Sequence, residues 1–177
     1  MIEVKELTKS FGDKLVLENL STTFSSGKIN LIIGRSGSGK TVAIKSMLGL
    51  HTIDSGGIYF DNRNFSIMND NEKKKIRKEI GMVFQGGALF DSMTIEENLS
   101  VPLIMFSKKN KSEIRERVNF CLDRVNLVNV NNLFPSDLSG GMQKRVAIAR
   151  AIVLNPKYLF CDEPNSGLDP YTATVID

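Results

Sequence analysis

The chain has 177 residues, of which 23 are Lys or Arg and 20 are Asp or Glu, so its formal net charge is +3. A hydrophobic share of 41% and a charged share of 24% lie near globular averages, which excludes disordered and fibrous classes. So small a charge gives no support to nucleic-acid binding, and a single histidine, His51, excludes a site built from several histidines.

The short apolar stretches and the two cysteines indicate in which cellular compartment the chain is expected. The first ten residues lack the apolar core of a signal peptide, and runs such as Val101–Phe106 are far shorter than the roughly 18 residues of a membrane span. Cys121 falls in a helical pattern and Cys161 in an apolar strand pattern, so we expect no disulfide framework. We therefore expect a soluble chain in the reducing cytosol.

Strand signals come first along the chain. Apolar residues that alternate with polar ones between Ile2 and Leu17 predict two strands paired through the turn 11–13. The denser apolar run Ile29–Ile33 predicts a strand buried on both faces. Val42–Leu48 then fits a helix that ends near Gly49.

Beyond residue 50, short strands alternate with helices. We expect strands at 58–60, 81–85 and 157–161, helices at 71–79, 93–106, 112–127 and 141–154, and a last helix that starts at Asp169-Pro170. Pro102 is expected to kink or split the helix that contains it. The alternation indicates an α/β core, and the helical stretch 91–133 resembles an insertion into that core.

A glycine-rich segment joins the apolar run to the helix after it. Gly34–Thr41 fits the pattern G-x-x-x-x-G-K-[ST], and its predicted flanks, a strand and a helix, argue against a merely flexible turn. Glycines let backbone N–H groups curl around anionic oxygens at a helix N-terminus. We predict that Lys40 contacts the β- and γ-phosphates of a nucleotide and that Thr41 ligates Mg²⁺. The predicted phosphate-binding residues are Gly34, Ser36, Gly37, Ser38, Gly39, Lys40, Thr41 and Val42.

Two carboxylates follow the predicted strand 157–161. In P-loop proteins an Asp at a strand end holds the Mg²⁺ shell, and we predict this role for Asp162. Glu163 is then placed to polarise the attacking water, a general-base contribution of about 10²–10⁴ in rate. The alternative is an ordinary acidic loop, which the phosphate loop elsewhere in the chain disfavours.

Three further segments complete a pattern with these motifs. Leu138–Met142 opens a helix ahead of the carboxylate strand, Gln85 ends a strand ahead of the helical stretch, and Ser166–Asp169 follows Glu163. In this order the motifs resemble the nucleotide-binding domain of ABC transporters, over the whole chain. The resemblance implies a P-loop ATPase core of α/β class with an N-terminal antiparallel β subdomain and an inserted α-helical subdomain. It also implies ATP and Mg²⁺ as cofactors and ATP hydrolysis as the activity.

The resemblance gives each segment a role. Leu138–Met142 looks like the family signature, which usually ends in Gln where this chain has Met142. Gln85 looks like the glutamine that senses Mg²⁺ and the attacking water beside the transmembrane partner, so it joins Lys40 and Glu163 as a catalytic candidate. The segment that ends at Asp169 looks like the loop that crosses the dimer interface. Phe11 stands where the family places an aromatic residue on adenine, with a strand-end core aromatic as the alternative.

The signature segment also has the chemistry of a second anion site. Ser139, Gly140 and Gly141 start a helix, so their N–H groups can face an anion. If each ATP lies between Gly34–Thr41 of one copy and this segment of another, the assembly is a two-fold homodimer that holds two ATP. The alternative is a plain helix N-cap with a permissive loop.

The resemblance predicts an incomplete domain. It divides the chain into a core with the β subdomain at 1–90 and 155–177, and a helical subdomain with the signature helix at 91–154. Complete members continue with a strand that ends in a His at the γ-phosphate, and His51 lies at the wrong end of the domain to replace it. We therefore expect the C-terminal strands to be missing, with a break in the sheet between 29–33 and 157–161. An ATP-binding chain without turnover stays open as an alternative.

A narrower resemblance concerns the transport system. The segment 84–94, with Glu97 and Asn98 behind it, is similar to the ATPases of MCE-associated, Mla-type lipid transporters, as are Met142 and Lys144-Arg145. This implies a phospholipid or other lipid cargo in a diderm envelope, a permease and an MCE-domain lipid-binding protein as partners, and a cytoplasmic position on the inner face of the inner membrane. Importer-type ABC systems for amino acids or lipoproteins share the general pattern. A soluble ABC ATPase that acts on DNA or ribosomes is the alternative from another class.

Two stretches have a plain structural interpretation beside a functional one. The apolar residues of 101–106 fit a groove for a permease helix, but core packing is favoured. The basic run 73–78 is favoured as a solvated helix face over a headgroup or nucleic-acid site, because Glu72 and Glu79 flank it at helical spacing.

Overall fold

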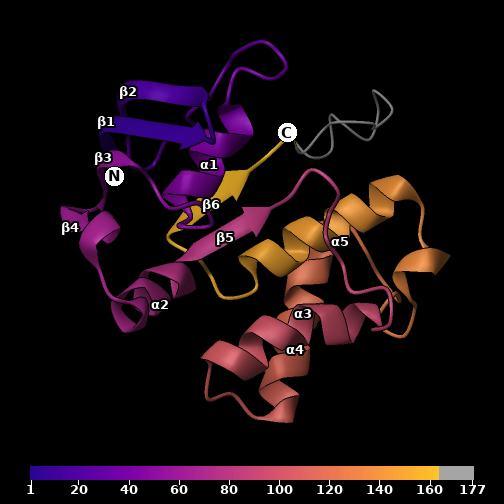
Figure 1. Cartoon of the computed structure of the whole chain (residues 1–177). Coiled ribbons are helices and arrows are strands. Elements are labelled where there is room, and N and C mark those ends of the chain that lie inside the picture. Colours follow the sequence, from indigo (N-terminus) through magenta and orange to yellow (C-terminus); the bar gives the residue numbers. More distant parts are fainter. Residues whose placement is uncertain (164–177) are drawn as a thin grey trace. The chain divides into compact units, whose positions relative to one another are not determined.

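A computed structural model describes residues 1–163 of the chain (Figure 1). These residues fall into two units, the first covering Met1–Arg77 and the second beginning at Lys78. The expected loop Ser166–Asp169 and the expected helix start at Asp169 lie outside the described residues.

The first unit holds a four-stranded sheet with the order β2-β1-β3-β4, in which all neighbours are antiparallel. The strands are β1 (Ile2–Phe11), β2 (Lys14–Phe24), β3 (Ser55–Phe60) and β4 (Arg63–Asn64). Gly12 turns β1 into β2 with φ +57°, a left-handed conformation that glycine adopts without strain. The predicted N-terminal strand pair is therefore confirmed. Its alternation buries Ile2 and Val4, and a register shift after Val4 precedes the buried Leu7.

Two helices complete the first unit. They are α1 (Lys40–Met47) and α2 (Asp70–Lys78), whose last residue begins the second unit. The predicted end of α1 near Gly49 is confirmed, since the Gly49 N–H donates to the Ser46 carbonyl at 3.0 Å and the residue has φ +68°. A side chain at Gly49 would strike the ring of Phe65, which packs edge-on against Phe60 with ring centroids 5.4 Å apart.

The apolar run 29–33 is not a strand, and the prediction was wrong. Its residues form no regular element, and Ile29, Leu31 and Ile33 are 90%, 79% and 89% exposed. A strand buried on both faces depends on backbone partners and covering side chains, and neither sheet of the described residues includes this segment. Because 29–33 forms no strand, the predicted break in the sheet between 29–33 and 157–161 stays untested.

The second unit is built on a parallel pair of strands, β5 (Ile80–Val83) and β6 (Tyr158–Cys161). Ile80 lies opposite Tyr158, and Val83 lies opposite Cys161. A Cβ at Gly81 would collide with the Ala151 carbonyl oxygen, so glycine lets the end of α5 (Gly140–Ile152) lie close to β5. The chain then runs from the end of α5 through residues 153–157 into β6.

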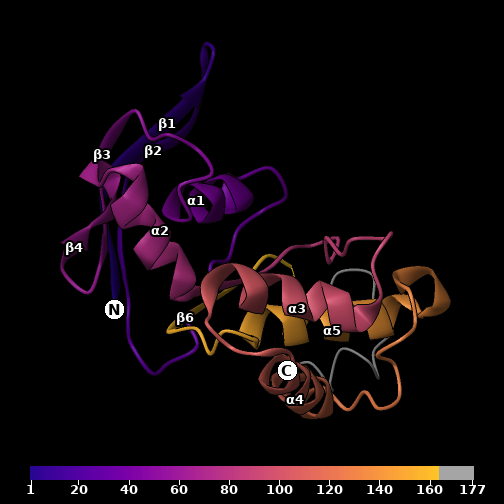
Figure 2. The ribbon, with the colours of Figure 1, turned by 90° about the horizontal axis from the view of Figure 1, so that it is seen from below.

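Three helices gather in the second unit (Figure 2). They are α3 (Ile95–Phe106), α4 (Lys111–Arg124) and α5. Thr94 caps α3 and Asn110 caps α4, each in a capping box with a glutamate three residues on. The expected split at Pro102 does not occur, because α3 runs unbroken through it.

A shared apolar core holds these helices together. It buries one stripe of each helix, in agreement with the amphipathic patterns of the sequence. Its most buried members, 0% exposed, are Ile95, Leu99, Val118, Cys121, Val146 and Ala149. None of the helices within residues 1–163 is long and apolar enough to cross a bilayer.

Candidate functional site

The glycine-rich loop leads directly into α1 in the first unit. The Ser38 N–H donates to the Arg35 carbonyl at 3.2 Å and closes the turn. Gly39, the N-cap of α1, has φ +93°, and a Cβ there would lie 2.9 Å from Leu17 Cδ2 and 3.3 Å from the Val16 carbonyl oxygen. Only glycine fits this backbone without strain. The loop therefore enters α1 in a conformation that the sequence motif dictates.

The start of α1 is suited to an anion. Gly39 offers no side chain to cap the helix, and the first turn contains no acidic residue. The Lys40 ammonium donates to the carbonyls of Gly34 and Arg35, at 3.0 and 3.1 Å, and no carboxylate within the described part of the chain pairs with it. A positive helix end and a lysine held only by carbonyls can exchange those contacts for phosphate oxygens.

The first glycine of the loop lies close to the Ser38 side chain. A Cβ at Gly34 would lie 2.5 Å from Ser38 Oγ, so a side chain at the first position of the loop would require the Ser38 hydroxyl to move. The remaining predicted phosphate-binding residues lie along the exposed loop or in the first turn of α1; they are Ser36, Gly37, Ser38, Thr41 and Val42.

Phe11 lies at the end of β1 with 45% of its surface exposed, which argues against a core role. Its ring meets the His51 ring edge-on, with centroids 5.2 Å apart, and the Lys9 ammonium lies 5.2 Å from its centroid. Lys9 is in turn fixed by Asp54 at 2.8 Å, and the pKa of Asp54 is lowered by hydrogen bonds from Lys9 and from the Ser10 N–H. The Lys9 ammonium thus lies over the ring and His51 packs against it, while part of the ring surface stays accessible.

The contact between His51 and Phe11 was not predicted. From the sequence, His51 was considered only as a replacement for the histidine at the γ-phosphate, because the pattern around it indicates only the end of α1. The two rings are brought together by the fold of the first unit across forty positions of the chain. No local spacing signals such a pair.

In the second unit, three predicted residues gather at one end of the parallel strands. The Gln85 side-chain N–H donates to a Glu163 carboxylate oxygen at 2.9 Å. The Asp162 N–H donates to the Val83 carbonyl at 2.9 Å, and Asp162 is 6% exposed. Because β5 and β6 are parallel, their carboxyl ends meet at the same edge and bring these side chains together.

This edge offers oxygen ligands of the kind that Mg²⁺ prefers. Asp162 supplies a carboxylate, and Gln85 keeps its amide oxygen as an acceptor while its N–H holds Glu163. Within residues 1–163 no group of three or more His, Cys, Asp or Glu forms a metal cage. Such a sparse set fits a magnesium ion that arrives with nucleotide phosphates and waters, rather than a permanently bound structural ion.

The predicted signature segment opens α5 in the same unit. Ser139 is the N-cap, and its hydroxyl accepts from the Met142 N–H at 3.3 Å. A Cβ at Gly140 would meet nothing within 4 Å, so the helix start is open to approach. Met142 packs on the apolar core, which accounts physically for a thioether at a position where the family usually has Gln.

The predicted site residues thus fall into two groups. Phe11 and 34–42 belong to the first unit, and Gln85, Asp162, Glu163 and 139–141 belong to the second. Asp169 lies outside the described residues.

The matching family model and the similar sequences indicate the same family. The family model described as "ABC transporter" matches residues 17–166. The methionine import ATP-binding protein MetN of Clostridium tetani is 43% identical over 176 residues, which are 99% of this chain and 55% of that protein. The probable ribonucleotide transport ATP-binding protein mkl of Mycobacterium leprae is 43% identical over 175 residues, 99% of this chain and 50% of that protein. The chain spans about half the length of these curated relatives.

Solved structures that resemble this chain indicate the same family. The dimeric post-hydrolysis structure of the ATP-binding cassette MJ0796, bound to ADP and Pi, has a TM-score of 0.91 and 35% identity, and the match covers 99% of this chain and 79% of that one. A second dimeric structure of the same bacterial ABC transporter cassette has a TM-score of 0.92 at 36% identity, with the same coverage.

Proposed function

Because the chain belongs to the ABC transporter family, we propose that it binds Mg²⁺-ATP and hydrolyses it as the nucleotide-binding part of a membrane transporter. The observation that carries the proposal is the start of α1, where an uncapped helix end and a lysine held only by carbonyls follow a glycine loop. The cassette bound to ADP and Pi among the structural relatives supports a nucleotide as the ligand.

Nucleotide binding is assigned to the first unit. The backbone of 34–42 receives the phosphates, with the Lys40 ammonium exchanging its two carbonyl partners for β- and γ-phosphate oxygens. Phe11 receives the adenine on its exposed ring surface. The Lys9 and His51 contacts hold the ring in place, so that little side-chain freedom is lost on stacking.

Hydrolysis is assigned to the strand ends of the second unit. Asp162 and the Gln85 amide oxygen, together with Thr41, would hold Mg²⁺, which supplies charge neutralisation on the phosphates. Glu163 accepts a proton from the attacking water, and the Gln85 N–H at 2.9 Å orients that carboxylate. Glu163 itself has φ +48°, a left-handed conformation that is uncommon outside glycine and is found more often at functional positions.

Assembly follows from the second anion site. We propose a homodimer in which Ser139, Gly140 and Gly141 of one copy cover the phosphates bound by the other. The open surroundings of Gly140 and the dimeric state of the related cassettes support this arrangement. Asp169, outside the described residues, is assigned to the same interface by family resemblance.

For the cargo we propose a lipid, with a permease and an MCE-domain protein as partners and the inner face of the inner membrane as the location. The support is the likeness of segment 84–94 to lipid-transport ATPases of the Mla type. Relatives named for methionine import and for ribonucleotide transport are each 43% identical, so an amino acid and a ribonucleotide are the competing cargoes.

The direct test of nucleotide binding is Lys40→Ala in calorimetric titrations with Mg²⁺-ATP. Loss of the phosphate cation predicts at least about thirtyfold weaker binding, on the scale of a charged contact with phosphate. Lys45→Ala is the matched control, since it removes a lysine from the same helix outside the loop. Equal affinities for the two variants would reject the phosphate-loop assignment.

The cargo is tested in the source organism by deleting the gene. A lipid transporter predicts a more permeable outer membrane, with growth unaffected when methionine is limiting. Unchanged permeability together with poor growth on limiting methionine would replace the lipid by an amino acid.

A further inference from the structure

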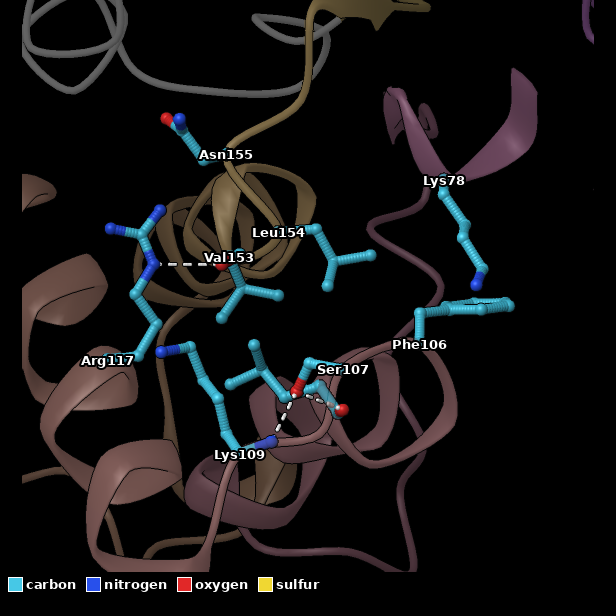
Figure 3. A pocket seen from close by; sticks show the side chains of 9 residues that line it. Lys78, Phe106, Ser107, Lys109, Arg117, Val153, Leu154 and Asn155 are labelled. Atoms are coloured by element: carbon cyan, nitrogen blue, oxygen red, sulfur yellow. Dashed lines mark hydrogen bonds between the residues drawn. The ribbon is translucent and has the colours of Figure 1, made fainter. Parts of the chain in front are cut away.

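A cavity of about 300 Å³ opens within the second unit (Figure 3). It lies between the end of α3 with the link that follows it, the middle of α4, the end of α5 and Lys78. None of the residues that line it is assigned above to nucleotide binding, hydrolysis or dimer formation. Its volume is at the lower end of the range of small-molecule sites. The question is which chemistry its lining favours.

Three cations line the cavity. Lys109 and Arg117 lie on one side and Lys78 lies beside Phe106 on the other (Figure 3), and the lining contains no Asp or Glu. None of these three cations forms an ion pair with a carboxylate in the described part of the chain. In Figure 3 the Lys109 side chain extends in the direction of Arg117. Like charges that share a cavity without a counter-ion create a positive potential that favours an anion.

Arg117 is held in position by the end of α5. Its Nε donates to the Val153 carbonyl at 2.8 Å, and its Nη2 donates to the Ile152 carbonyl at 2.9 Å. A guanidinium has five N–H donors, so others remain for a ligand. A fixed guanidinium loses little freedom on binding and suits the planar oxygen pair of a carboxylate or phosphate.

The other side of the cavity is mostly apolar. Leu103, at 2% exposure, forms part of its floor beside Leu154 and Phe106. The Lys78 ammonium lies 5.6 Å from the centroid of the Phe106 ring, so this lysine and the ring make one wall. A ligand that enters the cavity therefore meets charge on one side and hydrocarbon on the other.

The short link between α3 and α4 places Lys109 in this cavity. The Ser107 hydroxyl donates to the Leu103 carbonyl at 2.7 Å, and its oxygen accepts from the Lys109 N–H at 3.4 Å. Asn110 then caps α4 at once. The preceding lysine, Lys108, is exposed and does not line the cavity.

We propose that this cavity binds a small amphipathic anion, a carboxylate or phosphate group with a short apolar chain. Lys109 and Arg117 hold the anionic group, Lys78 adds charge at the rim, and the chain lies against Leu103, Phe106 and Leu154. The site is separate from the proposed nucleotide chemistry, so binding there needs neither ATP nor hydrolysis.

Three probes separate the parts of the ligand. Octanoate carries both the anion and the chain, inorganic phosphate carries only an anion, and octanol carries only the chain. Binding to the full chain is measured by titration calorimetry and by ligand-detected NMR. We expect saturable octanoate binding at least about tenfold tighter than that of either partial probe, because both sides of the cavity contribute.

Matched lysine variants locate the site. Lys109→Gln should weaken octanoate binding about threefold, and Lys78→Gln combined with Lys109→Gln about tenfold, the scale of partly exposed charge contacts. Lys108→Gln removes the same charge one residue away and should leave octanoate affinity unchanged. Because phosphate at the glycine loop does not involve these lysines, only binding that depends on Lys109 counts toward the site.

Three outcomes would overturn the proposal. One is the absence of saturable octanoate binding in the millimolar range. Another is phosphate binding that depends on Lys109 and is as tight as octanoate binding, which would leave the apolar side without a role. The third is an equal loss of octanoate affinity in Lys108→Gln and Lys109→Gln, which would mean general charge attraction.

Discussion

Helices α1 and α4 both begin after a polar loop, but their first turns are completed in opposite ways. At α4, the Asn110 side chain accepts from the Glu113 N–H at 3.0 Å, and the Glu113 carboxylate accepts from the Asn110 N–H at 2.7 Å. At α1, the N-cap is Gly39, which makes no side-chain cap, and the first turn has no acidic residue. The chain completes one helix start with its own side chains and leaves the other without them.

This difference separates a structural helix start from one that is suited to a ligand. A capping box satisfies N–H groups internally and adds stability. An uncapped start beside a lysine gives up that stability and gains affinity for an external anion. Helix α5 lies between the two cases, because Ser139 caps it at 3.3 Å but its first turn has no acidic residue. The predictions below test this contrast, starting with the largest effect.

The largest effect is expected for Gly39→Ala. A Cβ at φ +93° is strained and would lie 3.3 Å from a backbone carbonyl oxygen, so the loop must shift. We expect Mg²⁺-ATP affinity to fall about tenfold to a hundredfold, measured by calorimetry. Gly86→Ala is the control, since nothing lies within 4 Å of its Cβ position. A Gly39→Ala variant that binds ATP as tightly as the Gly86→Ala variant would contradict the assignment of the α1 start as the phosphate site.

A smaller effect is expected for Ser139→Ala. Loss of the cap should lower the free energy of unfolding by about 1 kcal/mol, and loss of a phosphate contact should weaken ATP-dependent dimerisation several-fold. Sedimentation in a Glu163→Gln background, where hydrolysis is slow, measures the dimer. Thr94→Ala removes the cap of α3 at a similar cost in stability and should leave the dimer intact. If both variants weaken the dimer equally, Ser139 is only a cap.

Asn110→Ala should act on stability alone. Removal of the α4 cap predicts a loss of about 1 kcal/mol in the free energy of unfolding, measured by urea denaturation, with ATP affinity unchanged. Ser112→Ala, in the exposed first turn of the same helix, is the control and should cost only a few tenths of that value. A parallel drop in ATP affinity would show that the capped helix start also serves the ligand.

The smallest effect concerns pH. Hydrogen bonds from the Thr94 N–H and hydroxyl hold the pKa of Glu97 below its ordinary value. Because the folded pKa is the lower one, this carboxylate stabilises the fold above its unfolded pKa, and the contribution is lost as pH falls through the folded pKa. Glu97→Gln keeps an amide oxygen for the capping box and should flatten this acid limb of the stability curve. An identical acid limb in the variant would contradict the assignment.

What the sequence predicted well was local. The glycine loop, the helix after it and the start of α5 depend on neighbours in the chain, so the residue types in these segments indicate the local backbone. The apolar run 29–33 looked like a strand by composition, but a strand needs partners that composition does not supply, and the segment is exposed. Pro102 was expected to kink or split α3, and the helix is not split, with Leu99 and Leu103 packed on the core on either side of the proline.

Contacts between distant segments are the part of the candidate site that could not be predicted from the sequence. The carboxylates and Gln85 were each predicted as site residues. The hydrogen bond from Gln85 to Glu163 at 2.9 Å, however, depends on β5 and β6 lying side by side, which no motif indicates. His51 against Phe11 and Arg117 against the end of α5 are pairs of the same kind. Such pairs require the fold, because their partners are tens of residues apart.

The most direct measurement of the central claim is the change in backbone amide chemical shifts of the labelled chain on addition of Mg²⁺-ADP. We expect large changes at 36–42, with a ring-current change at Phe11. Little change is expected at the capped helix starts, 95–97 and 111–113. Changes concentrated at the capped starts, or none in the glycine loop at saturating nucleotide, would contradict the claim that the open start of α1 is the phosphate site.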